Sequence, residues 1–92
     1  MRILLVEDDA DLAQFIRKGL KEERYAVDVA SNGEQGFELG IANPYDLIIL
    51  DIMLPVLDGL SLCRRLRDTG VTAPVLLLTA RDTVQDKVSG LD

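Results

Sequence analysis

Four short runs of aliphatic residues recur along this chain, and segments with a helical pattern separate them. The clearest run covers residues 47–50 and contains no polar side chain, which is typical of a strand buried on both faces of a sheet. Residues 2–6 and 75–78 form comparable runs, whereas the short run over 26–30 has Asp28 at its centre, which favours a position near the sheet edge. Because the runs recur at intervals of roughly 20 to 25 residues, they predict repeated βαβ units, and therefore a parallel sheet with right-handed crossovers.

Apolar residues with a period of about 3.6 predict amphipathic helices between these strands. Asp9 precedes the first helix and is interpreted as its cap, because a carboxylate at this position accepts the free N–H groups of the first turn. A third helix is predicted to begin at Asp58, and a short fourth helix is predicted over 81–92. The predicted apolar positions are Leu12, Phe15, Ile16, Gly19 and Leu20 in the first helix, Phe37 and Ile41 in the second, Leu60, Leu62, Cys63 and Leu66 in the third, and Val84, Val88 and Leu91 in the fourth.

The second helix is predicted to begin at Ser31, which has the spacing of a capping box with Glu34. Gly36 and Gly40 lie within this helix. Such small residues allow close packing on the sheet, or they make the helix weak, since glycine inside a helix costs about 1 kcal/mol relative to alanine. The sequence leaves both interpretations open.

The composition limits the size and the partners of the protein. The 92 residues, of which 48% are hydrophobic, are expected to form one small domain over 1–92. A formal net charge of −6 argues against nucleic-acid binding by this chain, because phosphate backbones are bound by clusters of Lys and Arg. Arg64, Arg65 and Arg67 form a local run, but they belong to the third predicted helix and are interpreted as a solvated face.

The histidine and cysteine content limits the reactions and metal sites that this chain can support. The chain has no histidine, which excludes imidazole metal ligands, a histidine general base and a role as a histidine phosphodonor. Cys63 is the only cysteine, so no internal disulfide forms, which is consistent with a protein of the reducing cytoplasm.

The sequence also bears on the location of the protein. No apolar stretch has the length of a membrane span, and Met1 leads into the first strand without a signal peptide. We therefore expect a soluble cytoplasmic protein without membrane association.

Acidic residues directly follow two of the aliphatic runs. Asp51 comes after the run at 47–50, and Glu7 and Asp8 follow the first strand. Because the carboxyl ends of parallel strands meet at one edge of the sheet, where ligands bind in open α/β sheets, we expect three carboxylates in one crevice. Such a cluster predicts a site for a hard divalent cation, and Mg²⁺ suits an open site with one or two carboxylates and water.

The same edge offers chemistry toward phosphorus. With a cation shielding its charge, Asp51 is a candidate nucleophile that would form an aspartyl phosphate. Thr79 follows the run at 75–78, so its hydroxyl is expected to reach the same crevice and contact a phosphoryl oxygen. Each residue alone is more often a cap, a solvated charge or a strand former, and only the combination favours this function.

Four motifs occur in order along the chain. They are the acidic pair at 7–8, Asp-Ile-Met-Leu-Pro at 51–55, Asp-Gly at 58–59 and Leu-Thr-Ala-Arg at 78–81. With these motifs the chain resembles the receiver domain of two-component response regulators over residues 1–92. Arg81-Asp82 and the segment 87–92 resemble receivers of the winged-helix transcription-factor subfamily, and the chain is expected to carry no output domain.

The resemblance implies a fold and a metal site. The fold is a flavodoxin-like, doubly wound parallel sheet, of which this chain is expected to supply four strands in the order 2-1-3-4. The metal is Mg²⁺, held by Asp8, Asp51 and the backbone carbonyl of Met53, with Glu7 acting through water.

The resemblance also implies a function. Asp51 is the phosphoacceptor and takes phosphate from the histidine of a sensor histidine kinase, while Thr79 and Ala80 contact the phosphoryl group and switch with it. The longer parent protein regulates transcription. The domain is not an enzyme, beyond self-catalysed phosphotransfer and dephosphorylation.

Three further expectations concern the limits of this resemblance. Compared with a complete receiver, the chain is expected to be truncated before the fifth strand with its lysine and the last helix, so the strand at 75–78 would expose an edge and self-associate. The alternative is an inert scaffold fragment. An aspartate-nucleophile phosphohydrolase explains Asp51 and Mg²⁺ equally well, but it requires a second carboxylate two residues later, where Met53 stands.

Overall fold

The computed structural model of the protein describes residues 1–78. The predicted helix over 81–92, Thr79 and Ala80 lie outside the described residues. The sequence predicted the bounds of three strands correctly, and the strand predicted at 47–50 also includes Asp51. In chain order the elements are β1 (Arg2–Val6), α1 (Ala10–Glu22), β2 (Ala26–Ala30), α2 (Gly33–Ala42), β3 (Leu47–Asp51), α3 (Gly59–Asp68) and β4 (Val75–Leu78).

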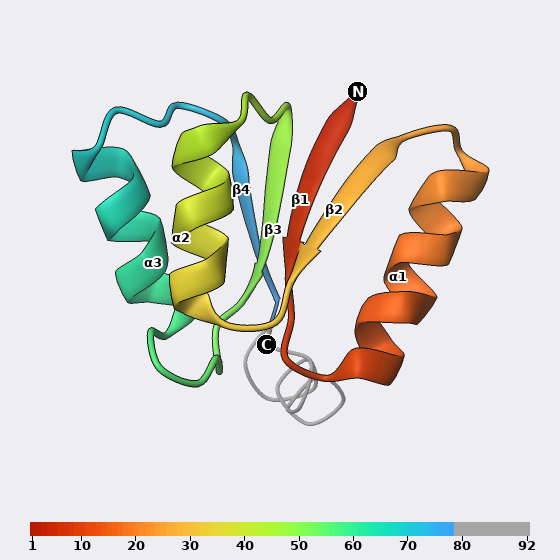
Figure 1. The fold of residues 1–92 in the computed structure, drawn as a ribbon, viewed down its shortest axis with the longest axis horizontal. Coiled ribbons are helices and arrows are strands. Elements are labelled where there is room, and N and C mark those ends of the chain that lie inside the picture. Colours follow the sequence, from red (N-terminus) through yellow and green to blue (C-terminus); the bar gives the residue numbers. More distant parts are fainter. Residues whose placement is uncertain (79–92) are drawn as a thin grey trace, which may run out of the picture.

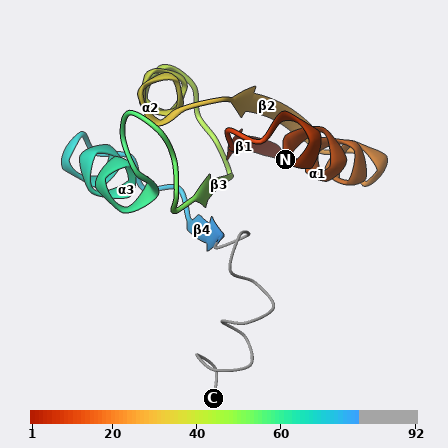
Figure 2. The same cartoon turned by 90° about the horizontal axis from the view of Figure 1, so that it is seen from below.

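The four strands form one parallel sheet in the order β2-β1-β3-β4. Helix α1 covers one face of the sheet, and α2 and α3 cover the other (Figures 1 and 2). This arrangement confirms the predicted doubly wound sheet and its strand order. It also confirms the edge position of β2, where Asp28 forms an ion pair with Arg2 at 3.0 Å. Because all strands run in parallel, their carboxyl ends meet at one edge, which is the lower edge in Figure 1.

The core divides into two halves because side chains alternate between the faces of a strand. Ile3 and Leu5 of β1 pack with α1, whereas Leu4 and Val6 pack on the side of α2 and α3. All four side chains are fully buried. No helix within residues 1–78 is long and apolar enough to cross a membrane.

Several predicted apolar positions are wrong. Phe15 is 77% exposed, because the side of α1 that meets the sheet carries Ala13, Ile16 and Leu20, and adjacent helical residues point about 100° apart. Gly19, Ile41 and Leu60 are likewise exposed. The remaining predicted positions of α1, α2 and α3 are buried or half-buried: Leu12, Ile16, Leu20, Phe37, Leu62, Cys63 and Leu66.

Strand β4 also differs from its prediction as a strand buried on both faces. Leu76 is 50% exposed and Leu77 is 36% exposed, while Val75 and Leu78 are half-buried. The physical reason is position, since β4 pairs only with β3 within the described part of the chain and lies at the end of that sheet.

The cap of α2 lies one residue later than predicted. Asn32, not Ser31, is the N-cap, and its side-chain oxygen accepts a hydrogen bond from the Gln35 N–H at 2.8 Å. The Gln35 side chain reaches back and accepts the N–H of Ser31 at 2.8 Å. Glu34 takes no part in the cap and pairs with Arg65 of α3.

The glycines of α2 serve close packing, which resolves the alternatives left by the sequence. A Cβ on Gly36 would stand 2.8 Å from a methyl of Val6, and a Cβ on Gly40 would stand 2.8 Å from a methyl of Leu66. Both distances are shorter than real Cβ contacts allow. The missing side chains therefore let α2 lie close to the sheet and to α3.

We predict opposite effects for two glycine-to-alanine substitutions. Gly36→Ala destabilises the fold by about 1 to 3 kcal/mol, because the new methyl meets a fully packed core. Gly19→Ala is the matched control, since nothing lies within 4 Å of its Cβ position, and it stabilises α1 by about 0.5 to 1 kcal/mol. Urea unfolding of both variants measures the difference, and equal stabilisation by both would contradict the packing role of Gly36.

Candidate functional site

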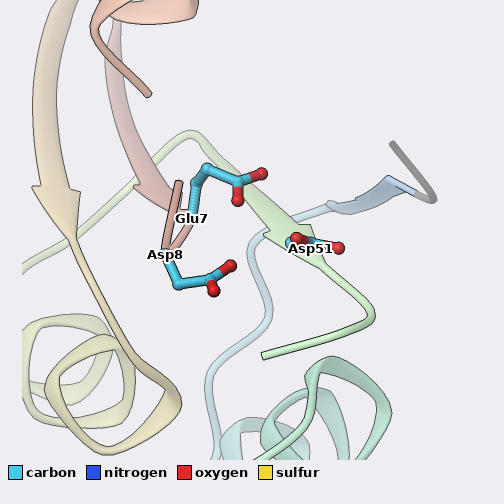
Figure 3. Close-up of side chains that lie close together, drawn as sticks. All are labelled: Glu7, Asp8 and Asp51. Carbon is cyan, nitrogen blue, oxygen red and sulfur yellow. The ribbon is translucent and has the colours of Figure 1, made fainter. Parts of the chain in front are cut away.

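Three carboxylates gather at the carboxyl edge of the sheet. Asp51 is the last residue of β3, and Glu7 and Asp8 directly follow β1. One oxygen from each of the three side chains lies within 4.8 Å of the others. Figure 3 shows the three side chains converging from the two neighbouring strand ends. The structure thus brings together the acids that the sequence placed there, while their roles as ligands and acceptor remain predictions.

The three acids differ sharply in exposure. Glu7 is 2% exposed and Asp51 is 6% exposed, whereas Asp8 is exposed. One carboxylate oxygen of Glu7, Oε2, accepts the N–H of Asp9 at 3.0 Å. The other oxygen, Oε1, is buried and has no hydrogen-bond partner among residues 1–78. From the sequence, Glu7 was expected to contact the metal through water, and nothing in the sequence indicated that its side chain would be buried.

Burial raises the pKa of Glu7 to about 7, and the neighbouring charge of Asp51 acts in the same direction. The hydrogen bond from the Asp9 N–H opposes this shift but does not cancel it. The site therefore holds a carboxyl group whose charged form is poorly solvated. Positive charge placed beside Glu7 would stabilise that form.

Asp51 is held in place by the loop that follows it. Its Oδ1 accepts the N–H of Met53 at 3.0 Å, which fixes the side chain relative to the backbone. The N–H of Ile52 donates to the carbonyl of Leu78 at 2.9 Å, so the end of β4 lies beside this turn. Position 53 is a methionine and therefore offers no carboxylate to act as a general acid. Its side chain is 47% exposed.

Helix α3 begins directly against the backbone of Asp51. Asp58 caps the helix by accepting the N–H of Ser61 at 2.9 Å, and this bond holds the pKa of Asp58 below its usual value. A Cβ on Gly59 would stand 2.3 Å from the backbone oxygen of Asp51. Only glycine permits this approach. The sequence identified Asp58-Gly59 as the entry to a helix, and the structure adds that Gly59 lies directly against the carboxyl end of β3.

The donor set fits a hard divalent cation. Carboxylate oxygens are the ligands that Mg²⁺ prefers, and the cluster offers three of them. The Oε1 atom of Glu7 is buried without a hydrogen bond from residues 1–78, which costs free energy of folding. A cation bound nearby would offset this cost. The exposure of Asp8 leaves the cluster open on one side.

Comparison with known proteins now identifies the family. The family model described as the response regulator receiver domain matches residues 3–92. The chain belongs to this family. Members of the family are phosphoacceptors rather than true enzymes, and the flavodoxin-like fold class predicted from the sequence is confirmed.

Curated relatives match the chain over nearly its whole length. RcaC of Microchaete diplosiphon is 56% identical over 92 residues, which are 100% of this chain and 14% of RcaC. ArlR of Staphylococcus saprophyticus is 46% identical over 99% of this chain and 41% of its own length. The transcriptional regulatory protein PcoR of Escherichia coli is 48% identical over 99% of this chain and 40% of PcoR. The chain therefore spans less than half the length of these relatives, which are consistent with the predicted winged-helix subfamily.

Solved receiver domains share the fold. The receiver domain of the sensor histidine kinase PA1611 from Pseudomonas aeruginosa superposes with a TM-score of 0.84 at 34% identity, covering 95% of this chain and 73% of that one. That structure contains a magnesium ion coordinated in its active site cleft. The response regulator TrrA from Thermotoga maritima, in complex with Mg²⁺ and BeF, superposes with a TM-score of 0.81 at 35% identity, covering 92% of this chain and 77% of that one.

We predict that Glu7 makes the metal-free fold less stable as the pH rises. The folded state raises the pKa of Glu7 from 4.5 to about 7, so it binds the proton more tightly than the unfolded chain does. This stabilisation is complete below pH 4.5 and is lost as the pH rises through 7. Glu7→Gln removes the titration, so with EDTA at pH 8 the variant should exceed the wild type in unfolding free energy by on the order of 2 kcal/mol.

Urea unfolding between pH 5 and pH 8 in EDTA measures the effect of Glu7→Gln. Asp11→Asn is the control, because it removes an exposed carboxylate of α1 outside the cluster. Stability curves for wild type and Glu7→Gln that stay parallel over this range would show that Glu7 is not desolvated.

Proposed function

We propose that Asp51 is the phosphoacceptor of this receiver domain and that the donor is the phosphohistidine of a sensor histidine kinase. One observation carries the proposal, namely that the Asp51 carboxylate lies at the carboxyl end of β3 within 4.8 Å of two further carboxylates. In the longer parent protein, the phosphorylated domain would regulate transcription.

In the proposed reaction, a carboxylate oxygen of Asp51 attacks phosphorus. The bond between the imidazole nitrogen and phosphorus breaks as the bond between oxygen and phosphorus forms, so the product is an acyl phosphate. The imidazole leaves with the electron pair and takes up a proton from solvent. The N–H of Met53 holds the Asp51 carboxylate in one orientation for this attack.

Asp8, Asp51 and the backbone carbonyl of Met53 would hold Mg²⁺, with Glu7 contributing through water. The chemistry that bound Mg²⁺ supplies is neutralisation of the charge that otherwise makes the carboxylates repel the phosphoryl oxygens. The buried Oε1 of Glu7, which accepts no hydrogen bond from the described part of the chain, supports this assignment.

Thr79 and Ala80 are proposed to contact the phosphoryl group and to change position with it. They lie outside the described residues, but the residue before them supports the proposal. Leu78 pairs with Asp51 in the register of β3 and β4, so the chain leaves β4 beside the acceptor. Transfer to Asp51 and loss of phosphate from it are proposed to be self-catalysed by the domain.

We also propose a cellular location for the domain and the absence of nucleic-acid binding. The domain would act in the cytoplasm and would not bind nucleic acid itself. The arginines of α3 support the second point, because Arg65 pairs with Glu34 and Arg67 donates to the carbonyl of Val71. These contacts fit the solvated helix face predicted from the sequence.

Amide NMR spectra test the acceptor and the metal site together. On addition of Mg²⁺, we expect the signals of Asp8, Asp51 and Met53 to shift, and on addition of beryllofluoride as a phosphoryl mimic we expect Thr79 to shift. Asp51→Asn should abolish the response to the mimic and weaken Mg²⁺ binding about tenfold, since it removes a charged ligand.

The control for these spectra is Asp11→Asn, which should respond like the wild type because Asp11 lies outside the cluster. A well-dispersed wild-type spectrum that is indifferent to both additions would overturn the proposal. That outcome would support the inert scaffold fragment instead.

We further propose that chains of this length self-associate along β4. Leu76 and Leu77 present apolar surface beside a strand with one partner among the described residues, and such edges pair with other chains. Leu76→Lys should shift the chain toward monomer in sedimentation velocity runs, because a charge on an edge strand opposes pairing.

Leu60→Lys is the control for self-association, since it places the same charge on an exposed leucine of α3. A wild-type chain that sediments as a monomer at every concentration tested would refute the association.

A further inference from the structure

The outer edge of β2 carries backbone groups that no strand among residues 1–78 pairs with. The Ala26 N–H donates to the carbonyl that precedes β1 at 3.0 Å, and the Ala30 carbonyl accepts the N–H that follows β1 at 3.0 Å. Residues that bond to one neighbour alternate along a parallel strand, so Asp28 also faces β1. The N–H and C=O groups of Val27 and Val29 therefore point outward, away from the sheet.

This edge lacks the features that normally prevent a strand from pairing with another chain. Such features include lysine, proline and bulges, whereas β2 has the sequence Ala-Val-Asp-Val-Ala. Its one charged residue, Asp28, pairs with Arg2 at 3.0 Å and accepts the Tyr45 hydroxyl at 2.7 Å. Because this charge is compensated within the domain, it opposes an incoming strand only weakly.

A groove of about 640 Å³ lies over the outer edge of β2. Residues 27–29 of the strand line it, and both helices that flank the strand contribute to it. Figure 2 shows β2 at the end of the sheet opposite β4, with α1 on one side and α2 on the other. The contributing helical residues include Ala13, Gln14 and Arg17 of α1 and Leu39 and Asn43 of α2. The open edge is thus the floor of a groove with two helical sides.

One positive charge in this groove has no ionic partner among the described residues. Arg17 lines the groove and is half-buried. Its guanidinium forms no ion pair within residues 1–78, and its hydrogen bond to the Gln14 side chain is long, at 3.5 Å. Arg2 also lines the groove, but its charge is matched by Asp28. A ligand carboxylate would therefore find its cationic contact at Arg17.

The side chains of β2 define the rest of the ligand. Val27 and Val29 point toward α1 and pack with the core cluster that includes Ala13. A strand added beside β2 places alternate side chains on this same face, where apolar side chains meet the valines. The net charge of −6 repels an acidic ligand, but salt screens this repulsion beyond about 8 Å, so a single acidic residue is attracted by the nearby Arg17.

We propose that the edge of β2 binds an extended peptide segment of another protein by strand addition. The peptide backbone bonds to the outward N–H and C=O groups of Val27 and Val29. One acidic side chain of the peptide pairs with Arg17, between apolar side chains on the same face. The backbone bonds supply affinity and the arginine supplies specificity, as in other cases of strand addition. The site does not depend on phosphorylation of Asp51.

Amide hydrogen exchange of the 92-residue chain, measured by NMR with a peptide of defined sequence, tests the proposal. The probe is acetyl-Thr-Val-Thr-Glu-Thr-Val-Thr-amide, which reads the same from either end and therefore serves parallel and antiparallel addition. At near-saturating peptide, we expect exchange of the Val27 and Val29 N–H groups to slow by about tenfold. The N–H of Asp28, which already faces β1, should keep its rate.

A double-mutant cycle tests the pairing with Arg17. A matched peptide with Gln in place of Glu should bind the wild-type chain about fivefold more weakly. Arg17→Gln should bind both peptides with equal affinity. Lys18→Gln is the control, because it removes an exposed neighbouring charge that does not line the groove, and it should keep the full difference.

Val29→Pro tests the backbone bonds. The substitution removes one outward N–H and leaves the bonds between β2 and β1 in place, which edge strands tolerate. It should abolish binding of the peptide. Val29→Ala also shortens the side chain but keeps the N–H, and it should still bind.

Three results would overturn the proposal. One is unchanged exchange at Val27 and Val29 in millimolar peptide, which needs no variant to fold. Another is protection that appears at β4 in place of β2. The third is protection of Val27 and Val29 that rises with chain concentration in the absence of peptide, which would assign this edge to a second copy of the chain. Equal affinity of the wild type for the Glu and Gln peptides would refute the role of Arg17.

Discussion

The pairing of β1 with β3 is the constraint on which the rest of the structure depends. Both strands are buried on both faces, and Val6 pairs with Leu50 in a parallel register. The next residue on each strand is then Glu7 and Asp51, so the register alone sets the two buried acids side by side. A shift of this register would move the two acids apart, so the strand pairing that builds the sheet also specifies the site.

Glycines adapt the helices to this sheet. Gly36 lets α2 approach Val6, and Gly59 lets α3 begin against the Asp51 backbone. The two contacts bear on β1 and β3, which carry the acids. The packing of the helices therefore affects the geometry of the site, because a methyl group added at either glycine would push the helix against a strand that positions one of the acids.

The sequence predicted the strands well because aliphatic runs and acid positions are local signals. It did not predict which apolar helical residues are exposed, since periodicity defines a face but not how much of that face a neighbour covers, as Phe15 shows. The capping position was missed because Ser31 and Asn32 are both good caps, and Gln35 decides between them. The φ of 72° at Val56, in the loop between β3 and α3, could not be predicted, since the loop has no glycine at this position to indicate a positive φ.

Stability and chemistry are opposed in the acidic cluster. Glu7 is buried, and one of its oxygens has no hydrogen-bond partner within the described residues. The charge of Asp51 lies close to it in a chain whose net charge is already −6. A fold optimised only for stability would replace Glu7 by an apolar residue or give it a cationic partner. Any cation that binds the folded cluster and not the unfolded chain removes this penalty and adds its own binding free energy to the fold. Because the acids sit at the ends of the two central strands, occupancy of the site and stability of the sheet are thermodynamically linked.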